Sequence, residues 1–458
     1  METRVTAPAY PVPAAIAIAI VCLLNPVHDT DLFWQVSFGE RLLAQRGPVF
    51  AEPFYPDAIG RPIVPIYGLA QVMDAAVVRM GGFESLKLLD ALIWAAAFTM
   101  PAWVAGRRFG QTGNLAALWG FFPASTFTML RPQSLALLGA GLLVALLLSR
   151  CSIRRKLILG LLIMVVWQNA HPSVVMAAFI LLPFVVIGWW RRMAPVAETL
   201  LLLLVPVAMI ATPAGTDVLS LMKINADRVA LFGISEWMPV YHASNRGVIT
   251  RTVIGLALQL LLIVSCVVRF PAFDVRIQNH ALIFGGMALG FLLMTILSHR
   301  IVLFFGVISV PLAMLIPHPP PRPAGRMGWP LLAMVVVVSW FGLKTGRLPL
   351  MNDWFPLEAA RALKAHQPAG PVFVTTEWGG LVSYHGMSPL MDGRYFARTH
   401  GECERYLATI RGEEPIDPAA VACFLTPDYK TLNRRMDVDP AWRVLYRDDN
   451  ATVYVRRN

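Results

Sequence analysis

Two aspartates lie two residues apart directly after the first apolar segment, in the stretch His28-Asp29-Thr30-Asp31-Leu32-Phe33-Trp34-Gln35-Val36. Carboxylates with this spacing at a membrane surface can bind a divalent cation, or one of them can act as a general base. A solvated helix cap at Asp31 is the structural alternative. The spacing alone does not decide between these interpretations.

Further ionisable or polar side chains follow later apolar segments or lie in the second long loop. Arg131, Asn169 with His171, and His299 with Arg300 follow apolar segments, and Glu236 with Trp237 lies in the loop 214–249. Ionisable groups at membrane depth are costly and usually line a polar cavity. Taken singly, each is explained as an interfacial anchor, with phospholipid headgroups as the partners of the arginines and the aromatic belt as the place of Trp237.

The elements that must position these residues are transmembrane helices. Of the 458 residues, 56% are hydrophobic and only 15% are charged, with a mean hydropathy of +0.58, whereas a soluble domain carries about 25% charged residues. A spanning helix needs roughly 20 apolar residues, which predicts a mainly α polytopic bundle of about eleven spans. The expected spans are 10–27, 84–104, 113–130, 133–149, 157–170, 172–190, 196–213, 250–268, 279–297, 301–316 and 329–346.

The charge distribution orients these spans. The net charge is +11, but residues 1–348 hold 26 basic and 14 acidic side chains, whereas residues 349–458 hold 13 and 14. The excess of basic side chains is confined to the membrane part, as the positive-inside rule expects. It therefore does not indicate a nucleic-acid partner. With the N-terminus in the cytoplasm, the basic loops fall inside: Arg107-Arg108, Arg150 to Lys156, Arg191-Arg192, Arg269 with Arg276, and Arg322 with Arg326.

This orientation places the polar helix ends and the tail on one side. Segments 28–83 and 214–249 and the tail then lie outside, together with the two first-loop aspartates and the polar residues at Arg131, Asn169 to His171, Glu236-Trp237 and His299-Arg300. We therefore expect two domains, a membrane module at 1–348 and a small extracytoplasmic, periplasmic α/β domain at 349–458. In that domain we expect a helix over 354–366, buried strands at 371–375 and 421–425, and a hairpin of 443–446 with 452–456.

The five cysteines are too few for a disulfide framework. Cys403 and Cys423 are the two outside the apolar segments, and an oxidising compartment would permit a bridge between them. A buried cysteine in a strand is ordinarily a small core residue. Both interpretations of this pair stay open.

Several short motifs together resemble bacterial integral-membrane glycosyltransferases of the GT-C superfamily, akin to the protein mannosyltransferase and aminoarabinose transferase families. The resemblance covers nearly the whole chain. It rests on the order of the motifs along the sequence and on their expected location on the same side of the membrane. They are Asp29 to Trp34, Gly39 to Leu43, Glu52 to Phe54, Tyr67 to Gln71, Leu130 to Gln133, Trp167 to His171, Ser235 to Pro239, Ser298 to Arg300, Glu377 to Gly380 and Met391 to Arg394.

The resemblance implies transfer of a sugar from a polyprenyl-phosphate-linked donor to a glycan, lipid or protein, at the outer face of the bacterial inner membrane. Asp31 matches the first-loop acid and is the candidate base, and Asp29 assists it or shares a divalent cation with it. The candidates for binding the donor phosphate are Arg131 and Arg300. His171 and His299 are the candidate hydrogen-bond partners at the same place. The residues expected to line the cavity or to contact the acceptor are Glu236, Trp237, Trp34 and Gln35.

Three alternatives remain at this point. A lipid-linked glycan flippase or transporter would carry midspan charges and internal repeats, and neither is visible in the sequence. An O-antigen ligase or polymerase also acts outside, on a diphosphate carrier. A non-catalytic assembly partner is the third, because Gln35 and Gly68 stand where related families often have a histidine and a glutamate-tryptophan pair. For the tail motifs at 377–380 and 391–394, a tight turn and a salt bridge inside the domain are the structural alternative.

Overall fold

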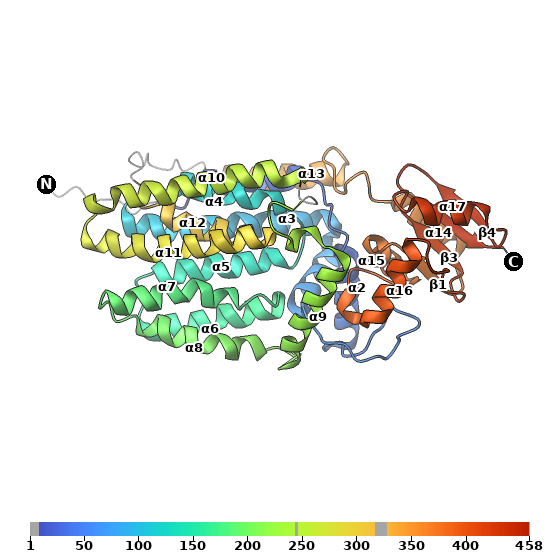
Figure 1. Cartoon of the computed structure of the whole chain (residues 1–458). Helices are drawn as coiled ribbons and strands as arrows, with labels where there is room; N and C mark the ends of the chain where they lie inside the picture. Colours follow the sequence, from blue (N-terminus) through green and yellow to red (C-terminus); the bar gives the residue numbers. More distant parts are fainter. Residues whose placement is uncertain (1–8, 243–245, 317–327, 458) are drawn as a thin grey trace. The chain divides into compact units, whose positions relative to one another are not determined.

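The computed structural model describes residues 9–242, 246–316 and 328–457 (Figure 1). Arg322 and Arg326, used above for the orientation, lie outside the described residues. The described chain forms 17 α-helices and a five-stranded sheet. Its contacts divide it into two compact units. The helical unit is Met1–Asn25, Phe83–Gly215 and Gly233–Pro349, and the mixed unit is Pro26–Gly82, Thr216–Phe232 and Leu350–Asn458.

These units differ from a simple division at residue 348. The chain passes from the helical unit into the mixed unit for the last time after Pro349, close to the expected boundary. The mixed unit also includes the first loop and the helix α9 (Asp217–Phe232). The long helix α3 (Gly68–Phe109) contributes to both units and is interrupted at Gly82, whose φ of 76° favours glycine.

Every apolar segment of the helical unit forms a helix, as the sequence predicts. The helices are α1 (Val12–Leu24), the second part of α3, α4 (Asn114–Ala124), α5 (Gln133–Leu148), α6 (Ile153–Ala170), α7 (Met176–Trp190), α8 (Val196–Ile210), α10 (Arg246–Arg269), α11 (Val275–Leu297), α12 (Val302–Ala313) and α13 (Gly328–Lys344). Three described helices are long and apolar enough to cross a membrane: Gly68–Phe109, Thr250–Ala272 and Val275–Leu297. The total of about eleven spans stays a prediction, because the other apolar helices are shorter.

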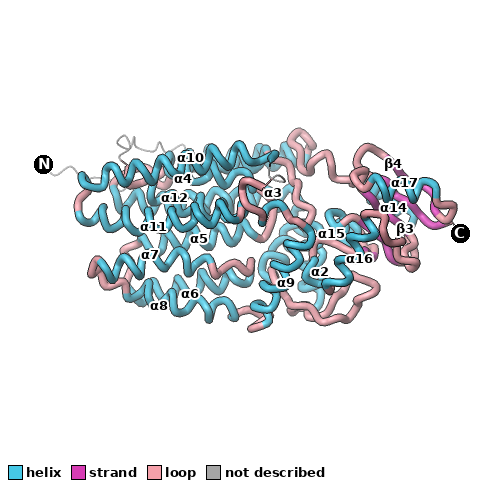
Figure 2. Tube along the Cα trace, viewed as in Figure 1, coloured by secondary structure: helices cyan, strands magenta, loops and turns pink. Residues whose placement is uncertain are grey.

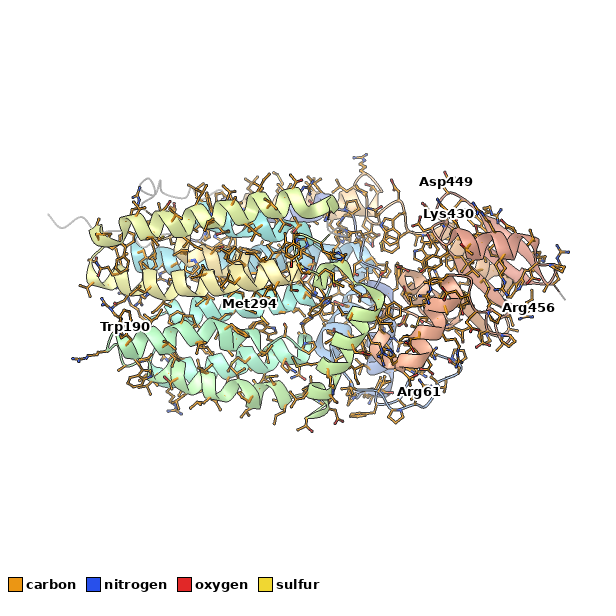
Figure 3. The ribbon with its side chains drawn as sticks, viewed as in Figure 1. Arg61, Trp190, Met294, Lys430, Asp449 and Arg456 are labelled. Atoms are coloured by element: carbon orange, nitrogen blue, oxygen red, sulfur yellow. The ribbon has the colours of Figure 1, made fainter. Side chains whose placement is uncertain are left out.

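The outer surface of the helical unit is rich in exposed apolar side chains. Trp190 at the end of α7 is 68% exposed (Figure 3), and Leu203, Val268 and Leu297 are exposed on other helices. A soluble protein rarely exposes so much contiguous apolar surface. The surface therefore suits a hydrocarbon environment.

At the centre of the helical unit, α12 is buried along its whole length. It crosses α4 where Gly120 and Gly306 face each other, and a Cβ at either position would lie 2.5 Å from the carbonyl oxygen of the other. Small residues of this kind let helix backbones approach closely in membranes. The absence of side chains at these two positions therefore permits the close crossing of α4 and α12.

The mixed unit combines a helix from the first loop with the tail's sheet (Figure 2). Its further elements are α2 (Leu32–Gln45), α14 (Leu357–His366), β1 (Pro371–Val374), α15 (Thr376–Tyr384), β2 (Ser388–Pro389), α16 (His400–Ile410), β3 (Ala422–Leu425), α17 (Lys430–Val438), β4 (Trp442–Arg447) and β5 (Thr452–Arg456). The strand order is β2-β1-β3-β5-β4, with β1 parallel to both of its neighbours. The expected strands and the β4–β5 hairpin are confirmed. The helix expected from 354 begins only after Pro356.

The two tail cysteines are free and completely buried. Cys423 pairs with Phe373 and Tyr454 at the centre of the sheet, and Cys403 packs from α16 into the same apolar core. The possible Cys403–Cys423 disulfide is therefore absent. The core interpretation is the correct one, because both side chains serve as small apolar residues.

Candidate active site

The two first-loop aspartates stand at the start of α2 in the mixed unit. The Asp31 amide donates to Oδ1 of Asp29 at 3.2 Å, and the indole Nε1 of Trp34 donates to Oδ1 of Asp31 at 2.9 Å. Asp31 occupies the N-cap position, but its side chain makes no capping bond. Its φ of −69° and ψ of −20° are helical rather than the extended values of a usual cap. The cap alternative is therefore not what the structure shows.

A glycine of the tail closes against the Asp31 carboxylate. A Cβ at Gly393 would lie 2.1 Å from Oδ1 of Asp31. Likewise, a Cβ at Gly380 would lie 3.0 Å from the Trp34 nitrogen, and one at Gly379 only 1.9 Å from the Met391 carbonyl oxygen. The two tail motifs are thus packed onto the start of α2. No side chain fits between them.

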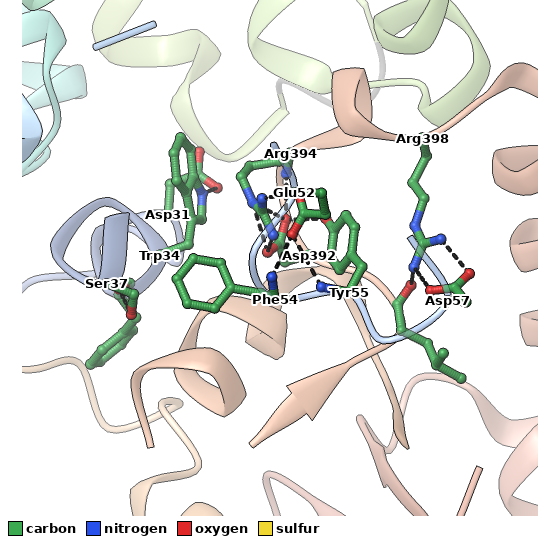
Figure 4. A network of polar contacts seen from close by, with 12 residues as sticks. Asp31, Trp34, Ser37, Glu52, Phe54, Tyr55, Asp57, Asp392, Arg394 and Arg398 are labelled. Carbon is green, nitrogen blue, oxygen red and sulfur yellow. Dashed lines mark hydrogen bonds and ion pairs between the residues drawn. The ribbon is translucent and has the colours of Figure 1, made fainter. Parts of the chain in front are cut away.

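The segment that carries Gly393 is held by a buried ion network (Figure 4). Arg394 donates to both oxygens of Asp392, and its Nη1 donates to Oε2 of Glu52 at 2.6 Å. Tyr55 donates a short hydrogen bond to Asp392, and the Arg394 guanidinium lies 4.4 Å from the centre of the Tyr55 ring. A buried charge is tolerated only when it is paired and fully hydrogen-bonded. This network therefore orders the first loop and the tail together.

The expected turn and salt bridge at Asp392-Gly393-Arg394 are present, with the Arg394 amide donating to Asp392 at 2.8 Å. Sequence reasoning missed Glu52 as the second counterion. The only signal was that Glu52-Pro53-Phe54 and Met391 to Arg394 both belong to the motif series. Burial lowers the pKa of Arg394, but the carboxylates of Asp392 and Glu52 and the phenol of Tyr55 outweigh it, so the pKa is raised and the guanidinium stays charged.

Two more arginine pairs join the same loop to the tail. Arg398 binds both oxygens of Asp57, at 2.5 and 2.9 Å (Figure 4). Arg61 binds both oxygens of Glu402, at 2.8 and 2.7 Å. Bidentate pairs of this kind are geometrically specific as well as strong. The position of residues 50–63 is therefore set by the tail.

A second group of predicted residues forms a cluster in the helical unit. Glu236 receives hydrogen bonds from Arg131 Nη1 at 3.1 and 3.0 Å and from Arg300 Nη1 at 2.7 Å. Arg300 also lies 4.8 Å from the ring centre of Trp237. Two guanidiniums thus face the same carboxylate. Guanidiniums placed side by side can stabilise an anion.

Glu236 is therefore the counterion of both arginines. Burial raises the pKa of its carboxyl, but Arg300 and Arg131 outweigh that effect and hold the pKa below its ordinary value. The carboxylate stays ionised, which keeps both guanidiniums aligned when no other anion is present.

The two histidines stand at the edge of this cluster. His171 Nδ1 is 2.9 Å from the Ser173 hydroxyl. Burial lowers the pKa of His171 well below its ordinary value, and the charges of Arg300 and Arg131 act in the same direction, so the ring is neutral. His299 is buried, with Nε2 2.7 Å from the Thr252 hydroxyl and its ring against Phe127.

Trp34 and Gln35 are buried rather than open to a cavity, each 3% exposed. Trp34 packs with Phe38, Leu42 and Val49, and the oxygen of the Gln35 amide makes no hydrogen bond among the described residues. In this structure Trp34 supports α2 and orients Asp31. Within the described ranges, no group of three or more His, Cys, Asp or Glu side chains could hold a metal ion.

The structure thus gathers the predicted site residues into two groups. Asp29, Asp31, Trp34 and Gln35 belong to the mixed unit, whereas Arg131, His171, Glu236, Trp237, His299 and Arg300 belong to the helical unit.

The fold matches solved membrane glycosyltransferases. ArnT, the aminoarabinose transferase, from Cupriavidus metallidurans in the apo state matches with a TM-score of 0.52 and 14% identity, over 97% of this chain and 96% of that one. The Archaeoglobus fulgidus oligosaccharyltransferase tethered to an acceptor peptide matches with a TM-score of 0.54 and 8% identity, over 98% of this chain and 74% of that one. No protein-family model and no curated protein sequence matches the chain. The predicted GT-C resemblance is confirmed at the level of the fold.

Proposed function

We propose that this chain transfers a sugar from a polyprenyl-phosphate-linked donor to an acceptor at the outer face of the cytoplasmic membrane. The observation that carries the proposal is the fold shared with two sugar transferases over 97% and 98% of the chain. Fold alone does not specify activity. The two groups of site residues supply the chemical support.

The arginine cluster provides what a departing polyprenyl phosphate needs. As the bond between the anomeric carbon and the phosphate oxygen breaks, negative charge grows on that oxygen. Glu236 binds both Arg131 and Arg300 and so holds the two guanidiniums side by side, and guanidiniums match phosphate oxygens in a bidentate manner. Neutral His171 adds a hydrogen-bonding group next to them.

Asp31 is the proposed general base. The acceptor hydroxyl attacks the anomeric carbon and gives its proton to the Asp31 carboxylate, which is positioned by Trp34 and lies against Gly393. Asp29 positions Asp31 through the backbone amide. A divalent cation on the two carboxylates stays part of the proposal, and the acceptor is left open among glycan, lipid and protein.

The test uses the full chain in proteoliposomes with a polyprenyl-phosphate donor that carries a labelled sugar. We expect labelled product, and a loss of about 10²-fold or more in Arg131→Gln and Arg300→Gln, the usual effect of removing one charge-stabilising donor. Arg192→Gln, an exposed arginine outside the cluster, is the matched control. Movement of intact labelled donor across the bilayer without transfer to any acceptor would instead establish the flippase alternative.

A further inference from the structure

A cationic cavity lies in the helical unit, away from the Arg131–Glu236–Arg300 cluster. It has a volume of about 300 Å³ and is lined by Trp103, Arg107, Arg108, Ser149 and Arg150 together with two aliphatic residues. None of these lining residues is acidic. Arg107 lies 5.5 Å from the ring centre of Trp103, which orients its guanidinium along the cavity wall.

Among the described residues, no acidic side chain forms an ion pair with the arginines of this cavity. Arg108 donates to Nε2 of His280 and to the Leu148 carbonyl oxygen, each at 3.1 Å, and both of these partners are uncharged acceptors. Arg150 and Arg276 lie close enough to interact electrostatically with Arg108. Among the nearby acids, Glu198 pairs with Lys156 at 2.8 Å, and Asp274 caps α11 and does not line the cavity.

A buried hydrogen-bond donor adjoins the same guanidinium. His280 is 4% exposed and lines a second cavity, of about 240 Å³, that Arg108 also lines. Because Nε2 of His280 accepts from Arg108, its proton resides on Nδ1. Nδ1 makes no hydrogen bond among the described residues. A buried donor of this kind ordinarily has a partner.

The depth of the cavity fits the headgroup region of a bilayer. Tyr10 stacks on Trp329 at 5.3 Å and meets Trp103 edge-on at 5.8 Å, so an aromatic cluster borders the cavity, as in the belts at membrane interfaces. His280 stands near the start of α11, and Arg300 follows the end of that helix. The intervening helix spans about 26 Å, close to the hydrocarbon thickness of about 30 Å. The two arginine clusters therefore fit opposite membrane surfaces.

We propose that Arg107, Arg108 and Arg150 form a binding site for a phosphate group, supplied by the headgroup of an anionic phospholipid. Basic pockets between transmembrane helices bind such headgroups. Guanidiniums match the phosphate oxygens in a bidentate manner, and Trp103 contributes an apolar wall for the glycerol backbone. The site is independent of the proposed sugar transfer.

The test uses the purified full chain in detergent with a photoactivatable phosphatidylglycerol, and the cross-linked peptides are mapped by mass spectrometry. We expect cross-links near residues 99–109 and 148–153. Their yield should fall about tenfold in the double variant Arg107→Gln/Arg150→Gln, because each lost charge-assisted hydrogen bond weakens binding several-fold. These two arginines are exposed, so the variant should fold. Arg154→Gln/Arg192→Gln removes the same charge from exposed positions outside both cavities and is the control.

Two competitors identify the source of the phosphate. Millimolar inorganic phosphate should compete weakly, and if it displaces the lipid fully, the site binds free phosphate rather than a headgroup. Phosphatidylcholine should compete poorly. Equal cross-linking in the double variant and its control, or equal displacement by phosphatidylcholine and phosphatidylglycerol, would overturn the proposal.

Discussion

The Asp31 carboxylate is held by its neighbours rather than by the helix that it precedes. Trp34 donates to it, the Asp31 amide donates to Asp29, and Gly393 lies close against Oδ1. A base that is positioned in this way needs little rearrangement before it accepts a proton. Two predictions follow at the scale of single residues.

Asp31→Asn should reduce sugar transfer by about 10²- to 10⁴-fold, the usual contribution of a general base. The amide keeps the shape and the contact with Trp34 but does not accept the proton. Initial rates with labelled donor measure the effect, and Asp428→Asn, at an exposed aspartate of the same unit, is the control. Asp29→Asn should be milder. Full activity in Asp31→Asn would remove the base assignment.

Gly393→Ala should impair transfer by about 10²-fold, because the new methyl group would displace the Asp31 carboxylate by an ångström or more. The unfolding temperature should change little by comparison. Gly401→Ala is the matched control, since a Cβ there meets no atom within 4 Å. If Gly393→Ala retains full activity, Asp31 does not act from the position described.

At the scale of elements, the crossing of α4 and α12 depends on the absence of side chains. Gly120→Ala would place a methyl group 2.5 Å from the Gly306 carbonyl oxygen. We expect a destabilisation of about 1–3 kcal/mol, typical of overpacking, measured as a lower unfolding temperature in detergent. Gly285→Ala in α11, where a Cβ has no neighbour within 4 Å, should have little effect. Equal stability of both variants would contradict this close crossing.

The contact between the first loop and α16 should depend on pH through Glu402. Burial raises the pKa of this carboxyl, but the hydrogen bonds from Arg61 and Thr399 outweigh burial and lower the pKa from its ordinary 4.5 to about 2. A lowered pKa in the folded state means that the stabilisation is complete above pH 4.5 and is lost as the pH falls toward 2.

Unfolding temperatures recorded across that range measure this contribution. Glu402→Gln should show a smaller decrease than the wild type over the same interval, whereas Glu358→Gln, at an exposed position on α14, should follow the wild type. A Glu402→Gln profile parallel to the wild type would exclude the Arg61–Glu402 pair as its source.

At the scale of the whole molecule, the basic loops predict a cytoplasmic N-terminus and an external tail. Reporter fusions after Arg192 and at Asn458 should report the cytoplasm and the outside, respectively. A cytoplasmic result at Asn458 would reverse the orientation, and with it the proposed place of the reaction outside the membrane.

The sequence by itself determined the local structure and its class. Apolar length predicted a helix in each of the segments, and strand and turn patterns predicted β1, β3 and the β4–β5 hairpin. The motif series also indicated the GT-C fold. These features were accessible because they depend on periodicity and composition within short windows, where neighbours along the chain determine the conformation.

Only the tertiary structure decided which distant residues meet. Glu52 and Arg394 form an ion pair although 342 positions separate them, and Glu236 binds Arg131 and Arg300 from another part of the chain. Gly393 proved to be the wall of the Asp31 site, and Cys403 and Cys423 proved to be core residues. Such pairings arise from packing and from the need to neutralise buried charge. No short stretch of sequence specifies them, because each partner is compatible locally with many others.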